Sequence, residues 1–206
     1  MSNKPSRAPI LVVLAGPNGA GKSTITPHVV IGPKLDADYI ARQLVPDDPE
    51  GTRGQRGAAM EMLRLLEQYK TEGRSYTWET TLSSHHSIKE IKTAVAAGYD
   101  VRLHFVALDS PTNSAERVEL RVSEGGHHIP TETLNRRFEI IMENLLIAAP
   151  LVKEFRLIDN HQDRFQTVLH TRNGEVLSIE RSDSARIDKA ITDTSIAIKR
   201  ASVVPG

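Results

Sequence analysis

Residues 10–24, ILVVLAGPNGAGKST, are the most informative part of the sequence. The first six, Ile10–Ala15, form an unbroken apolar run between Pro9 and Gly16, which is typical of a parallel strand buried on both faces. The next eight match the phosphate-binding pattern G-x-x-x-x-G-K-[ST] in full, after a strand and before a helix. We therefore predict a P-loop, with nucleotide-binding residues Gly16, Pro17, Asn18, Gly19, Ala20, Gly21, Lys22, Ser23 and Thr24.

Each residue type in this pattern has a chemical reason. Glycines let backbone N–H groups converge on phosphate oxygens, and the N-terminus of the following helix adds a favourable dipole. Lys22 is expected to reach the β- and γ-phosphates, and Ser23 to bind Mg²⁺. The expected cofactors are therefore ATP, or GTP, and Mg²⁺.

Outside the P-loop, apolar runs alternate with helical periodicities. The expected strands lie near residues 34–36, 75–78, 101–108 and 155–158, and the expected helices begin near residue 22 or lie near 52–71, 88–97, 110–124 and 134–145. Asn173-Gly174, between residues 166–171 and 175–180, is a strong hairpin signal. This order predicts an α/β fold of the three-layer, kinase-like P-loop NTPase type, with a parallel five-stranded core sheet, a lid region and an edge β-hairpin.

The composition limits the function classes. The 206 residues fit one domain, with a core at about 8–160, the edge hairpin at about 165–181 and a weakly ordered C-terminal segment at about 182–206, with one polar helix at most. Since 26 basic residues balance 26 acidic ones, we expect neither a nucleic-acid nor a membrane partner. The chain has no cysteine, and its N-terminal apolar run is too short for a signal peptide, so we expect a cytoplasmic protein.

Acidic residues follow three of the expected strands. Asp36 and Asp38 end the second strand, where one could accept the proton of an attacking hydroxyl or simply cap a helix. Glu79 could orient Mg²⁺ through water, and Thr80 could contact phosphate or substrate. Asp109 ends an apolar strand like a Walker B aspartate, but capping beside a serine is the preferred interpretation.

Basic residues bracket the connection Gly-Gly-His-His-Ile-Pro at 125–130. Arg117 and Arg121 share a helix face, and Arg136 and Arg137 begin the next helix, so the segment has the composition of a lid that closes over phosphates. The alternative is a solvated face paired with neighbouring glutamates. Asn160 lies where an adenine ring would rest, with an ordinary turn as the simpler explanation.

Taken together, these motifs resemble the zeta toxin family, particularly its short chromosomal members. The resemblance rests on residues 15–24, 38–41, 78–83, 98–101, 117–118, 121–122, 125–130, 136–138 and 159–160. It implies a P-loop kinase fold and ATP- or GTP-dependent phosphorylation of a UDP-linked N-acetyl amino sugar, such as UDP-N-acetylglucosamine, at its 3′-hydroxyl. It also implies an antitoxin protein as partner.

The resemblance assigns roles residue by residue. It makes Asp38 the general base and places Lys22, Ser23, Glu79 and Thr80 at phosphates and metal, with Arg117 in a phosphate clamp and Glu61 at the substrate. Arg121, Arg136 and Arg137 are further candidates for substrate binding. Asp36-Ala37 replaces the usual Asn-Pro and Ser84 a usual glycine, so the acceptor could be another small molecule. A nucleotide-dependent switch without phosphotransfer is the alternative from another class.

Overall fold

The computed structural model describes residues 7–47, 53–123 and 129–203. They form one seven-stranded sheet in the order β2-β3-β1-β4-β5-β6-β7. The strands are β1 (Ile10–Ala15), β2 (Lys34–Leu35), β3 (Tyr76–Thr80), β4 (Asp100–Ala107), β5 (Glu154–Asp159), β6 (Gln166–Arg172) and β7 (Glu175–Ile179). The first five in the sheet order pair in parallel, and β6 and β7 add antiparallel. The predicted parallel core with an edge hairpin is confirmed.

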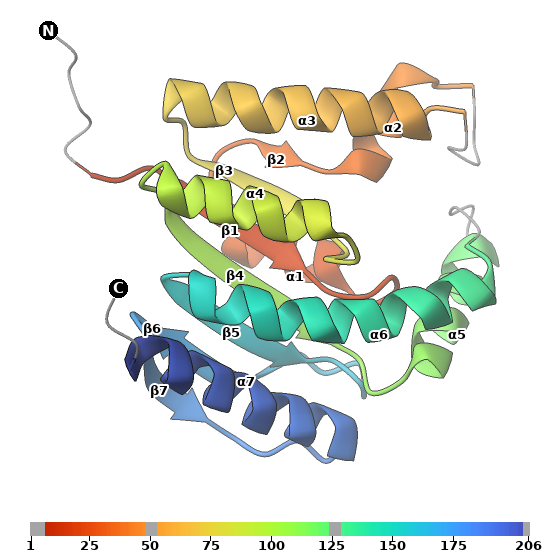
Figure 1. Cartoon of the computed structure of the whole chain (residues 1–206). Helices are drawn as coiled ribbons and strands as arrows, with labels where there is room; N and C mark the ends of the chain where they lie inside the picture. Colours follow the sequence, from red (N-terminus) through yellow and green to blue (C-terminus); the bar gives the residue numbers. More distant parts are fainter. Residues whose placement is uncertain (1–6, 48–52, 124–128, 204–206) are drawn as a thin grey trace, which may run out of the picture.

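Helices cover both faces of this sheet. They are α1 (Lys22–Val29), α2 (Ala37–Leu44), α3 (Gln55–Glu72), α4 (His85–Ala96), α5 (Pro111–Ser123), α6 (Thr131–Ala148) and α7 (Ala185–Val203). Figure 1 shows α4, α6 and α7 in front of the sheet and α1 behind it. The three-layer arrangement places the ends of the parallel strands, and the loops that follow them, at one edge of the sheet.

The central strand β1 is buried on both faces, as its apolar run predicts. Leu11 and Val13 belong to the larger core, which α3, α4, α6 and α7 also enter, whereas Leu14 packs with Ile25 of α1. Because no position of β1 after Ile10 is exposed, the strand is fixed in the middle of the molecule. The P-loop that follows it is therefore attached to the most rigid part of the fold.

The two-residue turn of the hairpin has the backbone that its sequence demands. Asn173 has φ 51° and Gly174 has φ 80°. Two successive left-handed residues are characteristic of the type I′ turn that joins twisted antiparallel strands. Asparagine and glycine tolerate this conformation better than other residues, so the local sequence determines the register of β6 and β7.

The C-terminal segment differs from the expectation. Instead of being weakly ordered, residues 185–203 form the 19-residue helix α7, which packs along the hairpin side of the sheet (Figure 1). Its buried side chains recur at helical spacing, at Ile187, Ala190, Ile191, Thr194 and Ile198. This apolar stripe is narrow and surrounded by polar residues, so its helical periodicity is weak in the sequence.

No helix among residues 7–47, 53–123 and 129–203 is long and apolar enough to cross a membrane.

Candidate functional site

The P-loop has the conformation that phosphate binding requires. Gly16, Gly19 and Gly21 all have positive φ, and Gly21 is the left-handed residue that begins α1. A Cβ on Gly16 would lie 2.2 Å from the carbonyl oxygen of Val106 on β4, so glycine is required there for close packing as well. The loop consequently turns tightly between β1 and α1, with the N-terminus of α1 beside it.

Lys22 is buried against the loop. Its Nζ donates hydrogen bonds to the carbonyl oxygens of Gly16 at 3.0 Å and Pro17 at 2.9 Å. Burial lowers the pKa of Lys22, while the negative charges of Glu79, Asp38 and Asp36 act in the opposite direction. The lysine therefore lies in the field of three of the four carboxylates that the sequence singled out after the expected strands, Asp109 being the exception.

Asp36 and Asp38 have different surroundings. Asp36 is the N-cap of α2, with its Oδ1 accepting from the backbone N–H groups of Asp38 and Tyr39, and its Oδ2 lies 3.2 Å from Lys34 Nζ. Asp38 is exposed in the first turn of α2 and lines the cavity described below. Both carboxylates line that cavity, but helix capping and the ion pair with Lys34 already engage Asp36, which leaves Asp38 as the candidate for proton transfer.

Glu79 and Thr80 are the last two residues of β3, inside the strand rather than after it. Glu79 is partly buried and forms an ion pair with Lys34, with Oε2 and Nζ 2.6 Å apart. Although burial opposes it, the hydrogen bond and charge of Glu79 raise the pKa of Lys34. Glu79 pairs in register with Leu14 of β1, so it lies one strand away from the P-loop.

Asp109, the other metal candidate, is occupied as a cap. Its Oδ1 accepts from Asn113 Nδ2 at 3.2 Å and from the Ser110 hydroxyl at 3.3 Å. Ser110 Oγ in turn accepts from the Asn113 backbone N–H at 3.1 Å, which caps α5. The preferred capping interpretation of this aspartate agrees with these contacts.

A cavity of about 880 Å³ opens at the P-loop edge of the sheet. It contains most of the residues that the sequence singled out: Asn18, Gly19, Ala20, Gly21, Lys22, Ser23, Thr24, Asp38, Glu79, Thr80, Arg117, Arg121 and Arg137. The wall opposite β3 comes from α3, with Ala58, Met62 and Leu66 among its apolar side chains. Its volume lies in the range of about 300–1,000 Å³ typical of small-molecule sites.

The apolar side chains of α3 were not foreseen as part of a site, although the family resemblance assigned Glu61 of the same helix to the substrate. The helical pattern near residues 52–71 predicts only a helix with an apolar face, and Met62 and Leu66 do belong to the core. Periodicity reports that a helix face is apolar, but it cannot distinguish a face that packs on the sheet from one that also borders a cavity. His86 and Ser87 on α4, which also line the cavity, carried no sequence signal of their own.

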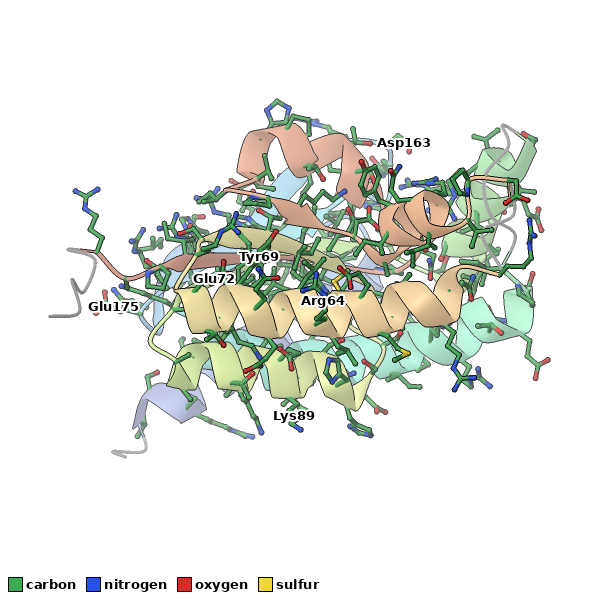
Figure 2. All side chains as sticks on the ribbon, turned by 90° about the horizontal axis from the view of Figure 1, so that it is seen from above. Arg64, Tyr69, Glu72, Lys89, Asp163 and Glu175 are labelled. Carbon is green, nitrogen blue, oxygen red and sulfur yellow. The ribbon has the colours of Figure 1, made fainter. Side chains whose placement is uncertain are left out.

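Two predicted substrate residues lie outside this cavity. Glu61 forms a two-point ion pair with Arg64 of the same helix, at 2.7 and 2.8 Å, and Figure 2 shows Arg64 on the near, outer side of α3. Arg136 is exposed on α6, whereas its neighbour Arg137 lines the cavity. Adjacent helical residues point about 100° apart. The structure therefore does not bring Glu61 and Arg136 together with the other candidate residues on the cavity, and their assignment to the substrate stays a prediction.

The helix α5 holds the P-loop and the loop after β5 together. Ser114 Oγ donates to the carbonyl oxygen of Asn18 at 2.7 Å, and Arg117 Nη2 donates to the carbonyl oxygen of Asn160 at 2.7 Å. Arg117 also pairs with Asp163 at 3.0 Å. These contacts fix the end of the cavity next to α5. The Gly125, Gly126, His127 and His128 connection lies outside the described residues.

Asn160 is buried beside the P-loop. Its Nδ2 donates to the carbonyl oxygen of Ala20 at 2.9 Å, and its side chain lies against Gly21 together with the Phe165 ring. Its Oδ1 has no hydrogen-bond partner within the described residues. Asn160 thus supports the loop directly, which goes beyond the ordinary turn that the sequence suggested.

The residues present suit one Mg²⁺ held mainly by nucleotide. Within the part of the chain that the structure describes, no three His, Cys, Asp or Glu side chains gather into a metal site. Mg²⁺ in phosphate-transfer sites commonly takes only one or two protein ligands and completes its shell with phosphate and water. Ser23 and Glu79, both on the cavity, fit that pattern.

The fold and the cavity define a P-loop, kinase-like nucleotide-binding domain. The chain belongs to the AAA domain family AAA_33, whose model matches residues 11–139. It is also 27% identical over 129 residues to an uncharacterized protein of Haemophilus influenzae, which covers 62% of this chain and 91% of that protein.

Solved structures share the whole architecture. The PezAT chromosomal toxin-antitoxin system of Streptococcus pneumoniae matches with a TM-score of 0.63 and 18% identity, over 96% of this chain and 89% of that one. The complex AvrRxo1-ORF1:-ORF2 with ATP matches with a TM-score of 0.58 and 14% identity, over 95% and 77%. The resemblance to the zeta toxin family is thus confirmed at the level of the fold.

Proposed function

We propose that this chain is an ATP- or GTP-dependent kinase of the zeta toxin type, which transfers the γ-phosphate to a hydroxyl group of a small molecule. The observation that carries the proposal is the single cavity, which joins the P-loop to the apolar wall of α3. A nucleotide-binding switch needs room for its nucleotide alone. A kinase needs room for a second molecule at the same phosphates, and this cavity offers it.

Asp38 is the general base of this proposal. It lies on the cavity, in the field of Lys22, and its side chain is not the cap of α2 because Asp36 has that role. A positioned carboxylate that accepts the proton of the attacking hydroxyl contributes about 10²–10⁴-fold to a rate. The proton passes from the acceptor hydroxyl to an Asp38 carboxylate oxygen as the new P–O bond forms, while the bond between the γ-phosphorus and the β,γ-bridging oxygen breaks and the nucleoside diphosphate leaves.

The phosphates are held by the P-loop and by basic side chains. Lys22 leaves its two carbonyl partners to bind the β- and γ-phosphates, and Arg121 and Arg137 neutralise the transferring group from α5 and α6. Arg121 acts on Lys22 electrostatically, which supports its nearness to the P-loop amine. Arg117 is the third member of the clamp, and Thr80 contacts the transferred phosphate or the acceptor.

Asn160 supports the nucleotide end, next to Ala20 of the P-loop. Ser23 and Glu79 would hold Mg²⁺, which supplies positive charge to the β- and γ-phosphates when it is bound. The Lys34 ammonium balances Glu79 in this structure, so Glu79 would hold Mg²⁺ only in place of, or shared with, that ion pair. The structure with ATP among the similar folds supports ATP as a nucleotide.

We further propose that the acceptor is a UDP-N-acetyl amino sugar, phosphorylated at its 3′-hydroxyl. This choice of acceptor rests on the family resemblance alone. The PezAT relative is part of a toxin-antitoxin system, so we also propose an antitoxin protein as partner and the cytoplasm as the location.

The test is phosphate transfer to a small-molecule extract of bacterial cells. Protein, Mg²⁺, ATP and extract are incubated, and mass spectrometry searches for compounds that gain one phosphoryl group. Lys22→Ala should abolish the gain because the lysine contacts the transferred phosphate, while the exposed Lys89→Ala on α4 should retain it (Figure 2). Equal transfer by both variants would refute the P-loop as the site of catalysis.

A further inference from the structure

The turn between β3 and α4 contains an unusual backbone conformation. Leu82 has φ 64°, which places a branched, non-glycine residue in the left-handed region, and its side chain is fully buried. Such residues are uncommon, and they persist only where the surrounding structure holds them. They also cluster at functional sites, so the contacts that hold Leu82 identify what the fold requires of this turn.

Two hydrogen bonds hold the turn. The Leu82 N–H donates to Thr80 Oγ1 at 3.2 Å, and the Leu82 carbonyl oxygen accepts from Asn144 Nδ2 at 2.8 Å. Asn144 belongs to α6 and is 3% exposed. It interrupts a face of α6 whose other buried members are apolar, among them Ile141 and Leu145. Burying an amide costs free energy unless the amide is hydrogen-bonded. The hydrogen bond to Leu82 therefore explains how asparagine is tolerated at this buried position.

The turn presents hydroxyl groups to the cavity. Thr80, Thr81, Ser83 and Ser84 all line it, and Thr80 pairs in register with Ala15, the last residue before the P-loop. Thr81 Oγ1 and Ser83 Oγ hydrogen-bond to each other at 2.8 Å, and the hydroxyls of Thr80 and Ser84 hydrogen-bond to Ser87 Oγ at 3.3 and 3.1 Å. Their positions depend on the left-handed residue at the centre of the turn, because a change of φ there would redirect every residue between β3 and α4.

Asn144 also relates this turn to the basic side of the cavity. Arg137, a proposed phosphate ligand, lies seven residues earlier on α6 and lines the same cavity. Residues seven apart lie on the same side of an α-helix, two turns from each other. The hydrogen bond from Asn144 to Leu82 therefore fixes the hydroxyl-bearing turn relative to the helix that carries the arginine.

We propose that Asn144 is a positioning residue for the acceptor: its amide holds Leu82 in the left-handed conformation and so sets the hydroxyl groups of residues 80–84 against the acceptor. This proposal rests on the proposed function. The acceptor must lie close to both Asp38 and the γ-phosphate for transfer, and displacement of about 1 Å can cost about a hundredfold in rate. The nucleotide is held mainly by the P-loop, so its affinity should depend much less on this turn than the affinity for the acceptor does.

The test compares Asn144→Leu with Asn135→Leu. Leucine has the same branched skeleton as asparagine, although it is larger, and it has no donor, so it removes the hydrogen bond. Asn135 is an exposed residue of the same helix and does not line the cavity, which makes it the matched control. Should Asn144→Leu fail to fold, Asn144→Asp, which is isosteric and lacks the amide donor, gives the same comparison.

Three measurements are made. Amide hydrogen exchange of residues 80–84 should speed up about tenfold in Asn144→Leu, as expected for the loss of one buried hydrogen bond. The concentration of extract that half-saturates phosphate transfer should rise about tenfold. The dissociation constant for ATP should stay within about twofold, because the P-loop is unchanged. Asn135→Leu should leave all three unchanged.

Unchanged exchange at residues 80–84 would overturn the proposal. The proposal would also be overturned if Asn144→Leu lost ATP affinity and phosphate transfer to the same extent, in step with a lower melting temperature. A residue with a merely structural role would give that result. If the wild-type chain phosphorylates nothing in the extract, the proposed function fails, and the exchange comparison still decides whether Asn144 holds the turn.

Discussion

Asp38→Asn, with Asp36→Asn as its partner, is the most informative substitution at the cavity. The two carboxylates are two residues apart at the start of α2, and the sequence alone does not decide which of them is the base. Both line the cavity, but Asp36 is already bonded to two backbone N–H groups and to Lys34, whereas Asp38 is exposed and is not the cap of α2. The structure therefore predicts opposite consequences for the same chemical change.

The magnitudes follow from these contacts. Asp38→Asn removes the proton acceptor and should lower turnover at least about a hundredfold, which corresponds to about 2.7 kcal/mol of activation free energy. In Asp36→Asn the amide oxygen can still cap α2, and only the ion pair with the partly exposed Lys34 is weakened. The free energy of unfolding should fall by about 1 kcal/mol or less, and turnover should change by less than about threefold.

The assay is the initial rate of phosphorylated product formed from the extract, measured beside the dissociation constant for ATP and a urea unfolding curve. Both variants should bind ATP like the wild type. A larger loss of turnover in Asp36→Asn than in Asp38→Asn would show that the base is the wrong carboxylate. Equal, small losses would show that neither accepts the proton.

Three further results are expected. Glu79→Gln should raise the Mg²⁺ concentration for half-maximal turnover and lower the maximal rate. Asp109→Asn, next to the cap of α5, should change the free energy of unfolding by about 1 kcal/mol or less. If a Mg²⁺ titration of turnover instead shifts in Asp109→Asn and not in Glu79→Gln, the metal residue is the one after β4. Hydrogen exchange of residues 117–123 and 129–137 should slow on addition of ATP, Mg²⁺ and extract together, and unchanged protection would favour a solvated face over a lid. Burial, with the charge of Arg156, lowers the pKa of His104 to about 4 from 6.5, so the unfolded chain takes up this proton first as the pH falls. Stability should drop between pH 6.5 and 4, by up to about 3 kcal/mol, and His104→Gln should flatten that drop in urea unfolding curves; an unchanged pH dependence would contradict the burial of a neutral imidazole.

The elements that local patterns encode could be predicted from the sequence. The P-loop strand, the parallel order of helices and strands, and the Asn173-Gly174 turn each depend on residues close in the chain. The apolar run of β1 requires burial on both faces wherever the strand lies, and a left-handed pair demands asparagine and glycine in any fold. Predictions of this kind were confirmed.

The parts that tertiary contacts decide could not be predicted in the same way. Arg136 and Arg137 are equivalent by composition, and only the rotation of α6 against the cavity separates them. Helical spacing permits the pair of Glu61 with Arg64 three residues on, but it does not reveal that this side of α3 lies away from the cavity. Leu82 offered no signal at all, since its backbone conformation depends on a hydrogen bond from a residue 62 positions away.

The most direct test of the central claim is a balance of products. In a reaction with Mg²⁺, ATP and extract, a kinase forms more ADP than inorganic phosphate, because the missing phosphate is attached to the acceptor. We predict a clear excess of ADP that depends on extract and disappears in Lys22→Ala. Equal amounts of ADP and inorganic phosphate would show that the chain hydrolyses ATP without transferring the phosphoryl group, and would contradict the account.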